Sequence, residues 1–284
     1  MILYPNCKIN IGLRVISKRE DGYHNLETIF YPIHGLYDVL MVSQSEHFSF
    51  EQTGLAVDCP MEDNLIVKCY RRMQARYPQI GNVSIRFEKR IPFGAGLGGG
   101  SSDAAHMAIA LNEIFELELT REQLAAEVAP LGADCAFFIY NTPCLAEGIG
   151  EQLTPIPFSL SGFRLMMFKP DIHVSTREAY AGIRLSGDQP SLARLVRTGI
   201  TPIALVKHAD IIYNDFELTV FPVHPELAEI KRRLLEAGAF YAAMSGSGST
   251  VYALFEDDAE HETPADYGLT DTSLADILIL NDRL

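Results

Sequence analysis

An alternation of apolar and polar side chains near the N-terminus predicts the first β-strand. Its period of two places the apolar set on one face and the polar set, which includes Lys8 and Asn10, on the other. Asp21-Gly22 is a turn signal, so a second strand is expected through residues 26–30. The apolar residues of the first strand are Cys7, Ile9, Ile11, Leu13 and Val15.

Helices are indicated by capping residues and by apolar stripes. Either Asp63 or Asn64 can accept a hydrogen bond from the first turn of a helix. From Asp103 onward, apolar residues recur three and four positions apart, which predicts a helix with one buried face. Capping boxes and a C-terminal glycine mark further helices. The expected boundaries are starts after Thr120 and Ser175 and an end at Gly238.

Further strands are expected where short apolar runs alternate with polar residues or flank glycine-rich turns. Taken alone, the mixed order of strands and helices favours an α/β sheet. The proline-containing stretch at residues 154–157 is a candidate domain boundary. The further strands are expected at residues 83–87, 163–168, 239–244, 251–255 and 277–280.

Composition and charge narrow the class of protein. The chain has 284 residues, 48% of them hydrophobic, which suits one large domain or two ordinary ones with a sizeable core. The 23 Lys and Arg residues against 37 Asp and Glu residues leave a formal charge of −14. So acidic a chain has no electrostatic footprint for nucleic acid or for an anionic membrane. It must bind any phosphate through backbone amides and a few placed cations.

The sequence carries no targeting or metal-binding signal. It has no signal-peptide-like start and no eighteen consecutive apolar residues, which argues against secretion and against a membrane span. Its five cysteines form no C-x-x-C pair, as is typical of reduced thiols in the cytosol, and no His/Cys cluster has zinc spacing. We expect a cytoplasmic protein with no resident metal and no membrane partner.

The glycine-rich segment at residues 94–102 is the strongest chemical signal. It has five glycines in seven residues, so successive backbone amides are uncovered and can converge on an anion. A helix starting at Ser101-Ser102-Asp103 adds its first N–H groups and its dipole. The segment therefore predicts a phosphate site, with a purely structural glycine loop as the plain alternative.

Other nucleotide-binding motifs fit this segment poorly. Gly94-x-Gly96-x-x-Gly99 matches the dinucleotide fingerprint, but the acids that follow lie in or just after the next helix. A Walker A loop ends in Gly-Lys-Ser/Thr, and this segment has no lysine. The protein-kinase motifs H-R-D and D-F-G are absent. A dinucleotide oxidoreductase remains the alternative from another enzyme class, and a nucleotide-binding regulator without turnover is a third.

The segment PFGAGLGGGSSDAA, residues 92–105, resembles the glycine-rich loop of the GHMP small-molecule kinases. The resemblance runs from Lys8 to about Phe255. It implies an α+β, two-domain GHMP kinase fold, with a ribosomal-protein-S5-like N-terminal domain over residues 1–152 and an α/β-plait-like C-terminal domain over residues 153–284. Further matching segments are PNCKIN (5–10), KREDGYH (18–24), LGAD (131–134), AEGIG (146–150), VST (174–176), NDFE (214–217) and SGSG (245–248).

The resemblance implies ATP- and magnesium-dependent phosphoryl transfer to a hydroxyl group. The branch most similar in these segments acts on the 2-hydroxyl of a cytidine diphosphate-linked methylerythritol, on the non-mevalonate route to isoprenoid precursors. The nearest alternative is another GHMP kinase, acting on mevalonate, homoserine or a sugar. Magnesium would bind mainly through substrate phosphates, since no acidic residue stands out as its ligand. The expected partners are therefore ATP and this small molecule.

Two residues match the catalytic positions of the family. The resemblance implies that Asp134 is the general base and that Lys8 keeps its carboxylate ionised and offsets charge on the phosphoryl group. Each has a plain alternative. A strand lysine is ordinarily a solvated charge, and an aspartate after Gly132-Ala133 can cap a helix.

The resemblance assigns further residues to the two ligands. Asn10 would hydrogen-bond the hydroxyl region of the substrate. Tyr23 and His24 would hold the cytidine with Tyr180 on its other side, and ordinary packing is the alternative for each. The expected ATP-binding residues are Pro92, Phe93, Gly94, Ala95, Gly96, Leu97, Gly98, Gly99, Gly100, Ser101, Ser102, Asn64 and Lys89.

Simple explanations account almost as well for Asn64 and Lys89, and equally well for the Ser245–Gly248 segment. Asn64 could serve only as a helix cap, and Lys89 could be a solvated charge. The Ser245–Gly248 segment could supply amides near the phosphates or form only a tight turn between two strands.

Overall fold

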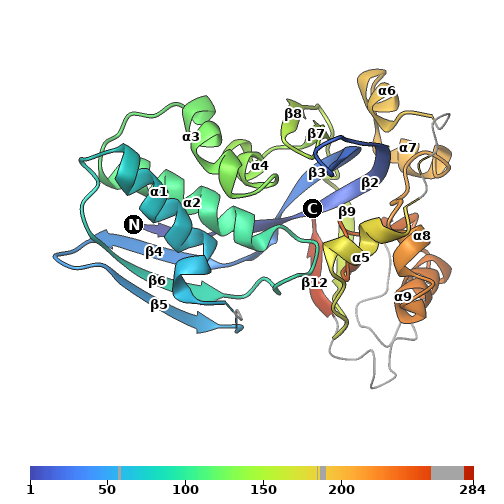
Figure 1. Ribbon diagram of the computed structural model, residues 1–284. Coiled ribbons are helices and arrows are strands. Elements are labelled where there is room, and N and C mark those ends of the chain that lie inside the picture. Colours follow the sequence, from blue (N-terminus) through green and yellow to red (C-terminus); the bar gives the residue numbers. More distant parts are fainter. Residues whose placement is uncertain (57–58, 184, 186–189, 257–277) are drawn as a thin grey trace. The chain divides into compact units, whose positions relative to one another are not determined.

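The computed structural model describes residues 1–56, 59–183, 185, 190–256 and 278–284 (Figure 1). Its mixture of helices and mostly antiparallel strands confirms the α+β class. The strands are β1 (Ile2–Leu3), β2 (Asn6–Lys18), β3 (His24–Tyr37), β4 (Val39–Gln44), β5 (Ser49–Gly54), β6 (Val83–Lys89), β7 (Cys144–Glu147), β8 (Gln152–Pro155), β9 (Phe163–Phe168), β10 (Tyr241–Met244), β11 (Val251–Glu256) and β12 (Leu278–Arg283). The helices are α1 (Leu65–Arg76), α2 (Gly99–Ile114), α3 (Arg121–Val128), α4 (Cys135–Tyr140), α5 (Thr176–Ala181), α6 (Leu192–Arg197), α7 (Pro202–Lys207), α8 (Glu217–Val220) and α9 (Pro225–Glu236).

The chain forms two compact units built from alternating segments. Strands β2 and β3 and the glycine-rich segment each contribute residues to both units, and β2 and β3 belong to a sheet of order β2-β3-β7-β8. Unit 1 consists of Met1–Lys8, Pro32–Phe93 and Gly98–Thr142, and unit 2 of Ile9–Tyr31, Gly94–Leu97 and Pro143–Leu284.

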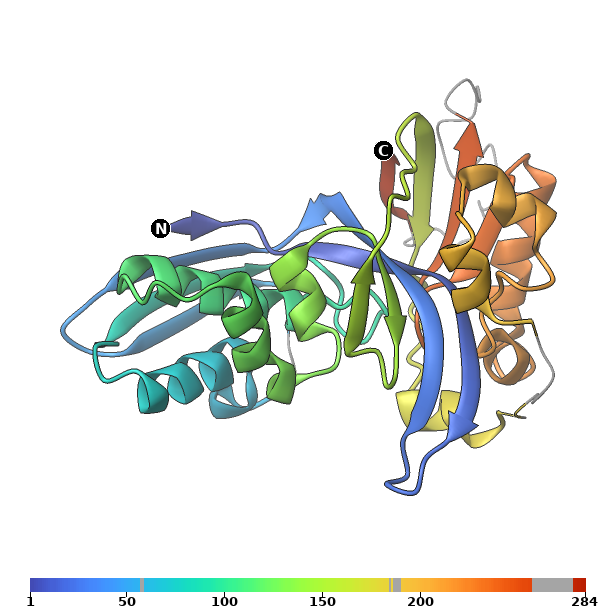
Figure 2. The ribbon, with the colours of Figure 1, turned by 90° about the horizontal axis from the view of Figure 1, so that it is seen from above.

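Unit 1 contains a sheet of order β1-β4-β6-β5 with helices α1–α4 on one face (Figure 2). The alternation in β6 accounts for this one-sided cover: Val83, Ile85 and Phe87 are buried, whereas Arg86 is exposed on the other face. The same register continues to Lys89, so the buried face of this strand ends in a lysine.

Helix α2 is the central helix of unit 1, and its predicted start was wrong. It begins at Gly99 with Gly98 as its left-handed N-cap residue, rather than in the segment 101–103. The prediction that only one face of this helix is buried was also wrong, because α2 contacts α1, α3, α4 and β4. Its alanines allow these close contacts, and even Asp103 is buried.

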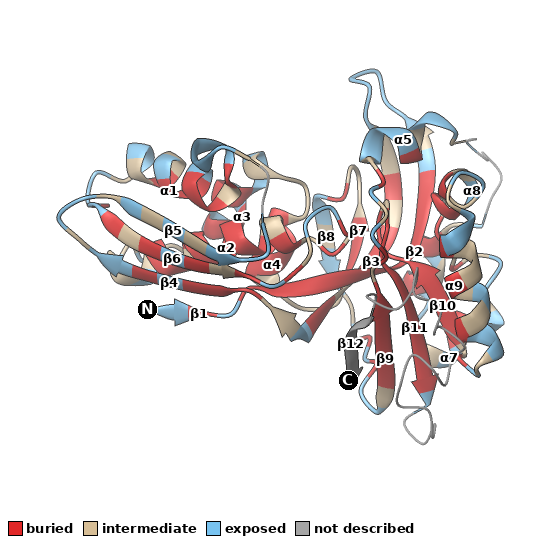
Figure 3. Ribbon diagram, turned by 90° about the horizontal axis from the view of Figure 1, so that it is seen from below, coloured by how far each residue is buried: buried red, intermediate tan, exposed pale blue. Residues whose placement is uncertain are grey.

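Unit 2 contains an antiparallel sheet of order β10-β11-β9-β12. Its buried side chains form one core with helices α5, α8 and α9 (Figure 3). Helix α9 contributes Leu227, Ile230 and Leu234, which lie on one side of an amphipathic helix. The strand expected at residues 277–280 is confirmed as β12 from Leu278 onward, and Ile277 lies outside the described residues.

Local capping signals were reliable, whereas the sheet class inferred from element order was not. The capping box at Thr120 and the cap at Ser175 both form, and Gly238 follows α9 with a positive φ. The α/β sheet favoured by element order is wrong, because nearly all neighbouring strands are antiparallel. Strands β4 and β5 were not expected, and β5 has Phe50 as its one large apolar side chain and lies at a sheet edge.

Candidate active site

Lys8 and Asp134 form an ion pair in unit 1. The Lys8 Nζ lies 3.3 Å from Asp134 Oδ2, and Lys8 is buried while the Asp134 side chain is 30% exposed. The solvated-charge alternative for Lys8 is therefore wrong. Asp134 occupies the N-cap position of α4, but its side chain makes no capping hydrogen bond. A buried cation thus faces a carboxylate that solvent can reach.

Gly98 brings the glycine-rich segment onto this pair. A Cβ at Gly98 would lie 3.1 Å from Lys8 Cε and 3.0 Å from the Phe138 ring, and its φ is +71°. Only glycine meets both demands without strain. The backbone at the start of α2 therefore packs directly over the Lys8 side chain.

The first turn of α2 presents backbone donors beside that pair. The first amides of a helix have no intrahelical acceptor, and the helix dipole adds positive potential there. The first such amide groups belong to Gly99, Gly100 and Ser101, while the Ser102 N–H already donates to Gly98 O at 2.9 Å. This turn can bind phosphate oxygens without a lysine.

The two serines of the segment face different surroundings. The Ser101 hydroxyl contacts the thiol of Cys135, next to Asp134, and burial raises the pKa of that thiol to about 11. Ser102 is fully buried, and its carbonyl oxygen lies 2.8 Å from His106 Nδ1. Burial lowers the pKa of His106. Ser101 therefore lies on the side of the helix that faces Cys135, and the Ser102 side chain points into the protein.

In unit 2, the first part of the glycine-rich segment interlocks with the Ser245–Gly248 turn. Ser245 Oγ donates to Gly96 O at 2.9 Å, and Thr250 N donates to Ala95 O at 3.3 Å. A Cβ at Gly96 would lie 2.0 Å from Ser245 O. The turn is therefore more than a connection between β10 and β11, because it shapes the backbone of the loop.

Replacing Gly96 by alanine should lower the free energy of unfolding by clearly more than Gly94→Ala does. Both positions have a positive φ, +75° and +63°, so each alanine costs about 1–2 kcal/mol of backbone strain. Gly96→Ala adds a clash with the Ser245 backbone, whereas the nearest group to a Cβ at Gly94 is the His173 ring at 3.6 Å. Denaturant unfolding of the two variants measures the difference. Equal losses of unfolding free energy would show that the close contact between Gly96 and Ser245 does not contribute to stability.

Asn10 lies beside the same turn. Its side-chain amide donates to Thr28 Oγ1 at 3.1 Å, and its backbone N–H donates to Ser245 Oγ at 3.2 Å. A further residue near the glycine-rich segment, His173, was not predicted from the sequence. His173 lies against Gly94, and nothing in its local pattern distinguished it from an ordinary loop histidine.

Lys89 belongs to a buried charge cluster behind the glycine-rich segment, so the prediction that it is a solvated charge is wrong. Its Nζ lies 2.5 Å from Asp38 Oδ2 and 2.9 Å from Asp103 Oδ2. Burial works to lower the pKa of Lys89, but the two carboxylates outweigh it and raise that pKa. A Cβ at Gly99 would lie 2.9 Å from the Lys89 Nζ. The ammonium group therefore lies directly behind the first residue of α2.

Asn64 is confirmed as a helix cap. Its Oδ1 accepts a hydrogen bond from Ile66 N at 2.9 Å, and its Nδ2 donates to Gln52 Oε1 at 3.3 Å. The next residue, Leu65, faces Gly100. A Cβ added at Gly100 would lie 3.5 Å from Leu65 Cδ1. Capping does not exclude a ligand contact, and Asn64 stays a predicted neighbour of the nucleotide.

The aromatic residues predicted to hold a base come together in unit 2. His24 and Tyr180 stack with ring centroids 4.7 Å apart and an interplanar angle of 17°, and Tyr180 meets Phe216 edge-on. Partial burial, with the Lys18 charge, lowers the pKa of His24, which favours the neutral imidazole. Tyr23 is 62% exposed on the adjoining hairpin. Tyr180 thus packs on the core of unit 2 and offers a ring at its surface.

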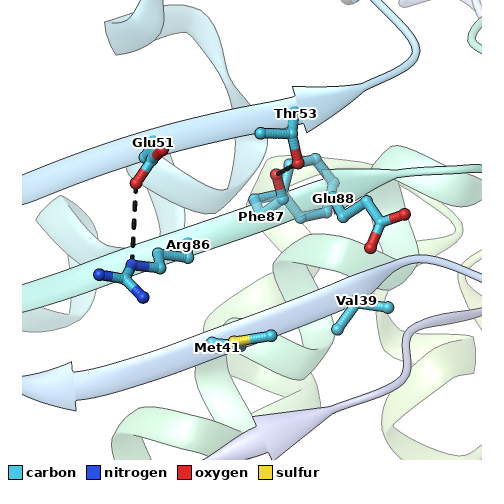
Figure 4. A pocket seen from close by; sticks show the side chains of 7 residues that line it. All are labelled: Val39, Met41, Glu51, Thr53, Arg86, Phe87 and Glu88. Carbon is cyan, nitrogen blue, oxygen red and sulfur yellow. Dashed lines mark hydrogen bonds and ion pairs between the residues drawn. The ribbon is translucent and has the colours of Figure 1, made fainter.

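One hollow in unit 1 lies away from all of these residues. It lies on the bare face of the sheet and is lined by side chains of β4, β5 and β6, among them Met41, Glu51 and Arg86 (Figure 4). The Glu51–Arg86 ion pair there is 3.7 Å long and exposed to solvent. No residue predicted for catalysis or binding lines this hollow.

Comparison with known proteins identifies the family. Residues 64–142 match the model of the GHMP kinases N terminal domain, and residues 203–263 match that of the GHMP kinases C terminal domain. A 4-diphosphocytidyl-2-C-methyl-D-erythritol kinase of Bacteroides thetaiotaomicron is 48% identical over 262 residues, covering 91% of this chain and 93% of the relative. The chain belongs to the 4-diphosphocytidyl-2-C-methyl-D-erythritol kinase family, a branch of the GHMP kinases.

Solved structures agree with this assignment. A crystal structure of 4-(cytidine 5'-diphospho)-2C-methyl-D-erythritol kinase has a TM-score of 0.73 and 34% identity, covering 89% of this chain and 90% of its own. The mevalonate kinase of Methanococcus jannaschii, at 15% identity and a TM-score of 0.67, covers 100% of this chain and 98% of its own and shows the same fold. The two-domain GHMP kinase fold is confirmed. The boundary at 152/153 lies between the two matched stretches and stays a prediction.

As a member of this kinase family, the chain is an ATP-dependent small-molecule kinase. This excludes the dinucleotide oxidoreductase that the accidental fingerprint left open. None of the helices within the described residues has the length and apolar composition of a membrane span.

Proposed function

We propose that this kinase transfers the γ-phosphoryl group of ATP to the 2-hydroxyl of 4-diphosphocytidyl-2-C-methyl-D-erythritol. The observation that carries the proposal is the Lys8–Asp134 ion pair directly beneath Gly98 and the first turn of α2. The acceptor is taken from the names of the relatives, and the mevalonate kinase, at 15% identity, shares only the fold. The reaction would serve isoprenoid precursor synthesis by the non-mevalonate route, in the cytoplasm.

Asp134 acts in this proposal as the general base. Its carboxylate takes the proton of the acceptor hydroxyl while that oxygen forms a bond to the γ-phosphorus. The bond from this phosphorus to the β–γ bridging oxygen breaks, and ADP leaves. Lys8 orients the carboxylate and offsets negative charge on the transferred group, which is the main work of a protein in phosphoryl transfer.

The glycine-rich segment binds the phosphates of ATP. The N–H groups of Gly99, Gly100 and Ser101 donate to phosphate oxygens, and the open backbone at residues 94–98 lets the phosphates approach. The Lys89 cluster supports the start of α2 from behind rather than contacting ATP through its ammonium group. Asn64, beside the same turn, would flank the nucleotide.

Magnesium fits this site as an ion held largely by ATP. No group of three or more His, Cys, Asp or Glu side chains within the described ranges could hold a metal. Magnesium keeps several waters and commonly binds to one or two protein oxygens plus phosphates. The Ser101 hydroxyl, in the first turn of α2, and the Asp134 carboxylate, paired with Lys8, would be the candidate protein oxygen donors. Magnesium would supply charge neutralisation of the β- and γ-phosphates.

The cytidine would bind at the aromatic cluster of unit 2. His24 and Tyr180 are already stacked, so a cytosine would either stack on an outer face of this pair or separate the two rings. Tyr23, exposed beside them, can cover the base. Asn10 would bind the hydroxyl region of the acceptor from strand β2.

Phosphoryl transfer assays test the proposal directly. With ATP and magnesium, we expect product from 4-diphosphocytidyl-2-C-methyl-D-erythritol and none from mevalonate or homoserine. ATP hydrolysis without any acceptor is the background to subtract. Transfer to mevalonate or homoserine but not to the cytidyl compound would contradict the proposed acceptor, while the chain would still be a small-molecule kinase.

A further inference from the structure

Helix α4 is held to strand β2 at both of its ends. At its N-terminal end, Asp134 pairs with Lys8 at 3.3 Å. At its C-terminal end, Asn141 pairs with Asn6, and Asn6 lies two residues before Lys8 on the same strand. Side chains two positions apart point to the same face of a strand. One face of β2 therefore contacts both the residue before α4 and the residue after it.

The Asn6–Asn141 contact is a reciprocal pair of amide hydrogen bonds. Asn141 Nδ2 donates to Asn6 Oδ1 at 2.8 Å, and Asn6 Nδ2 donates to Asn141 Oδ1 at 3.2 Å and to Cys7 O at 2.9 Å. Asn6 is only 2% exposed, so its amide has little water to replace a lost partner. A buried amide left without a hydrogen-bond partner destabilises the folded protein. The two side chains thus fix one another.

The backbone at Asn141 explains the choice of residue. Asn141 is the C-cap of α4 with φ +49°, and its N–H donates to Phe137 O at 2.7 Å. Glycine is the residue best suited to this left-handed conformation, and asparagine is the usual second choice. Glycine would end the helix equally well, so the side-chain amide must contribute something else. That contribution is the bond to Asn6.

From this geometry we infer that Asn6 and Asn141 are positioning residues for Asp134. The inference rests on the proposed role of Asp134 as base. Helix α4 has only six residues, too few to be stable by itself, so its position depends on its contacts with α2, α3 and β2. The amide pair sets the position of α4 along β2, and with it the distance from Asp134 to Lys8. A displacement of about 1 Å in a reacting group can reduce a rate 10²-fold.

The test compares Asn141→Gly and Asn6→Ala with the wild-type enzyme. Asn141→Gly keeps the left-handed backbone and removes only the amide. We expect each variant to lower kcat about tenfold while the KM for ATP and for the acceptor stays within about twofold, since the ligand contacts are unchanged. The double variant should lose little more than the worse single variant, because the two residues act as one unit.

Asn112→Ala is the matched control. Asn112 makes a similar pair of amide bonds, to the backbone of Leu119, at the far end of α2. It should lower the melting temperature without changing kcat. If Asn141→Gly and Asn6→Ala likewise lower only the melting temperature, measured well above the assay temperature, the positioning role is overturned.

Asp134→Asn separates this inference from the proposed function. In an Asp134→Asn enzyme with residual activity, adding Asn141→Gly should reduce kcat no further, because the amide pair acts through Asp134. A further tenfold loss of kcat would show that the amide pair acts on a group other than Asp134. A normal kcat for Asp134→Asn alone would instead remove the base and leave the amide pair without a catalytic group to position.

Discussion

Asp134→Asn should lower kcat by about 10²–10⁴-fold, the usual contribution of a general base. The amide has nearly the same shape as the carboxylate but cannot take a proton from the acceptor hydroxyl. The KM for ATP should stay within about threefold, since in the proposed site the phosphates are bound by the backbone of the glycine-rich segment and not by this side chain. Steady-state kinetics with the cytidyl acceptor measure both constants.

Asp63→Asn is the control for this variant. Asp63 forms an exposed ion pair with Lys68 and lies outside the proposed site. Its kcat should equal that of the wild type. If Asp134→Asn also turns over at a near-normal rate, phosphoryl transfer proceeds in this enzyme without a protein base, and the ion pair with Lys8 serves only the structure.

Lys89→Met should lower the free energy of unfolding by about 3–5 kcal/mol, the loss expected when one partner of a buried ion pair is removed. The methionine leaves Asp38 and Asp103 facing each other in a buried site without a cation. Burial already raises the pKa of Asp103, and one Asp103 oxygen has no hydrogen-bond partner. Urea unfolding, followed by circular dichroism, gives the difference from the wild type.

Two further variants test whether the effect of Lys89→Met comes from the loss of the buried ion pairs. Lys68→Met breaks an exposed ion pair and should cost less than about 1 kcal/mol. Lys89→Met combined with Asp103→Asn should recover part of the loss, because one buried carboxylate becomes neutral. A Lys89→Met protein as stable as the wild type, with a raised KM for ATP, would instead show that this ammonium group serves the nucleotide.

Much of the fold could be predicted because its signals are local. The period of two in β2 and β6, the capping box at Thr120 and the glycine after α9 each depend on residues within one strand or one turn. Strand β5 escaped prediction because an edge strand can form with a single large apolar side chain, here Phe50, and therefore shows no period of two. The start of α2 was misplaced because Gly99 and Gly100 are poor helix formers that packing against Ile91 and Leu65 overrides.

The candidate site was only partly predictable for the same reason. Residue types and motif resemblance pointed to Lys8, Asp134 and the glycine-rich segment. They could not show that Lys89 is buried between two aspartates or that the Ser102 side chain is fully buried. Nor did any pattern mark Asn6, Asn141 or His173. These properties depend on partners that are distant in the sequence.

The order of short motifs along the chain was enough to identify the family and with it the kinase chemistry, and backbone freedom at glycines was enough to predict where the phosphates bind. The packing of remote segments was needed to establish which charges are buried and paired. It placed Asp134 against Lys8, Lys89 behind Gly99 and Asn141 against Asn6. Burial and pairing arise only when remote segments pack together and exclude water, and no local period of side chains carries that information.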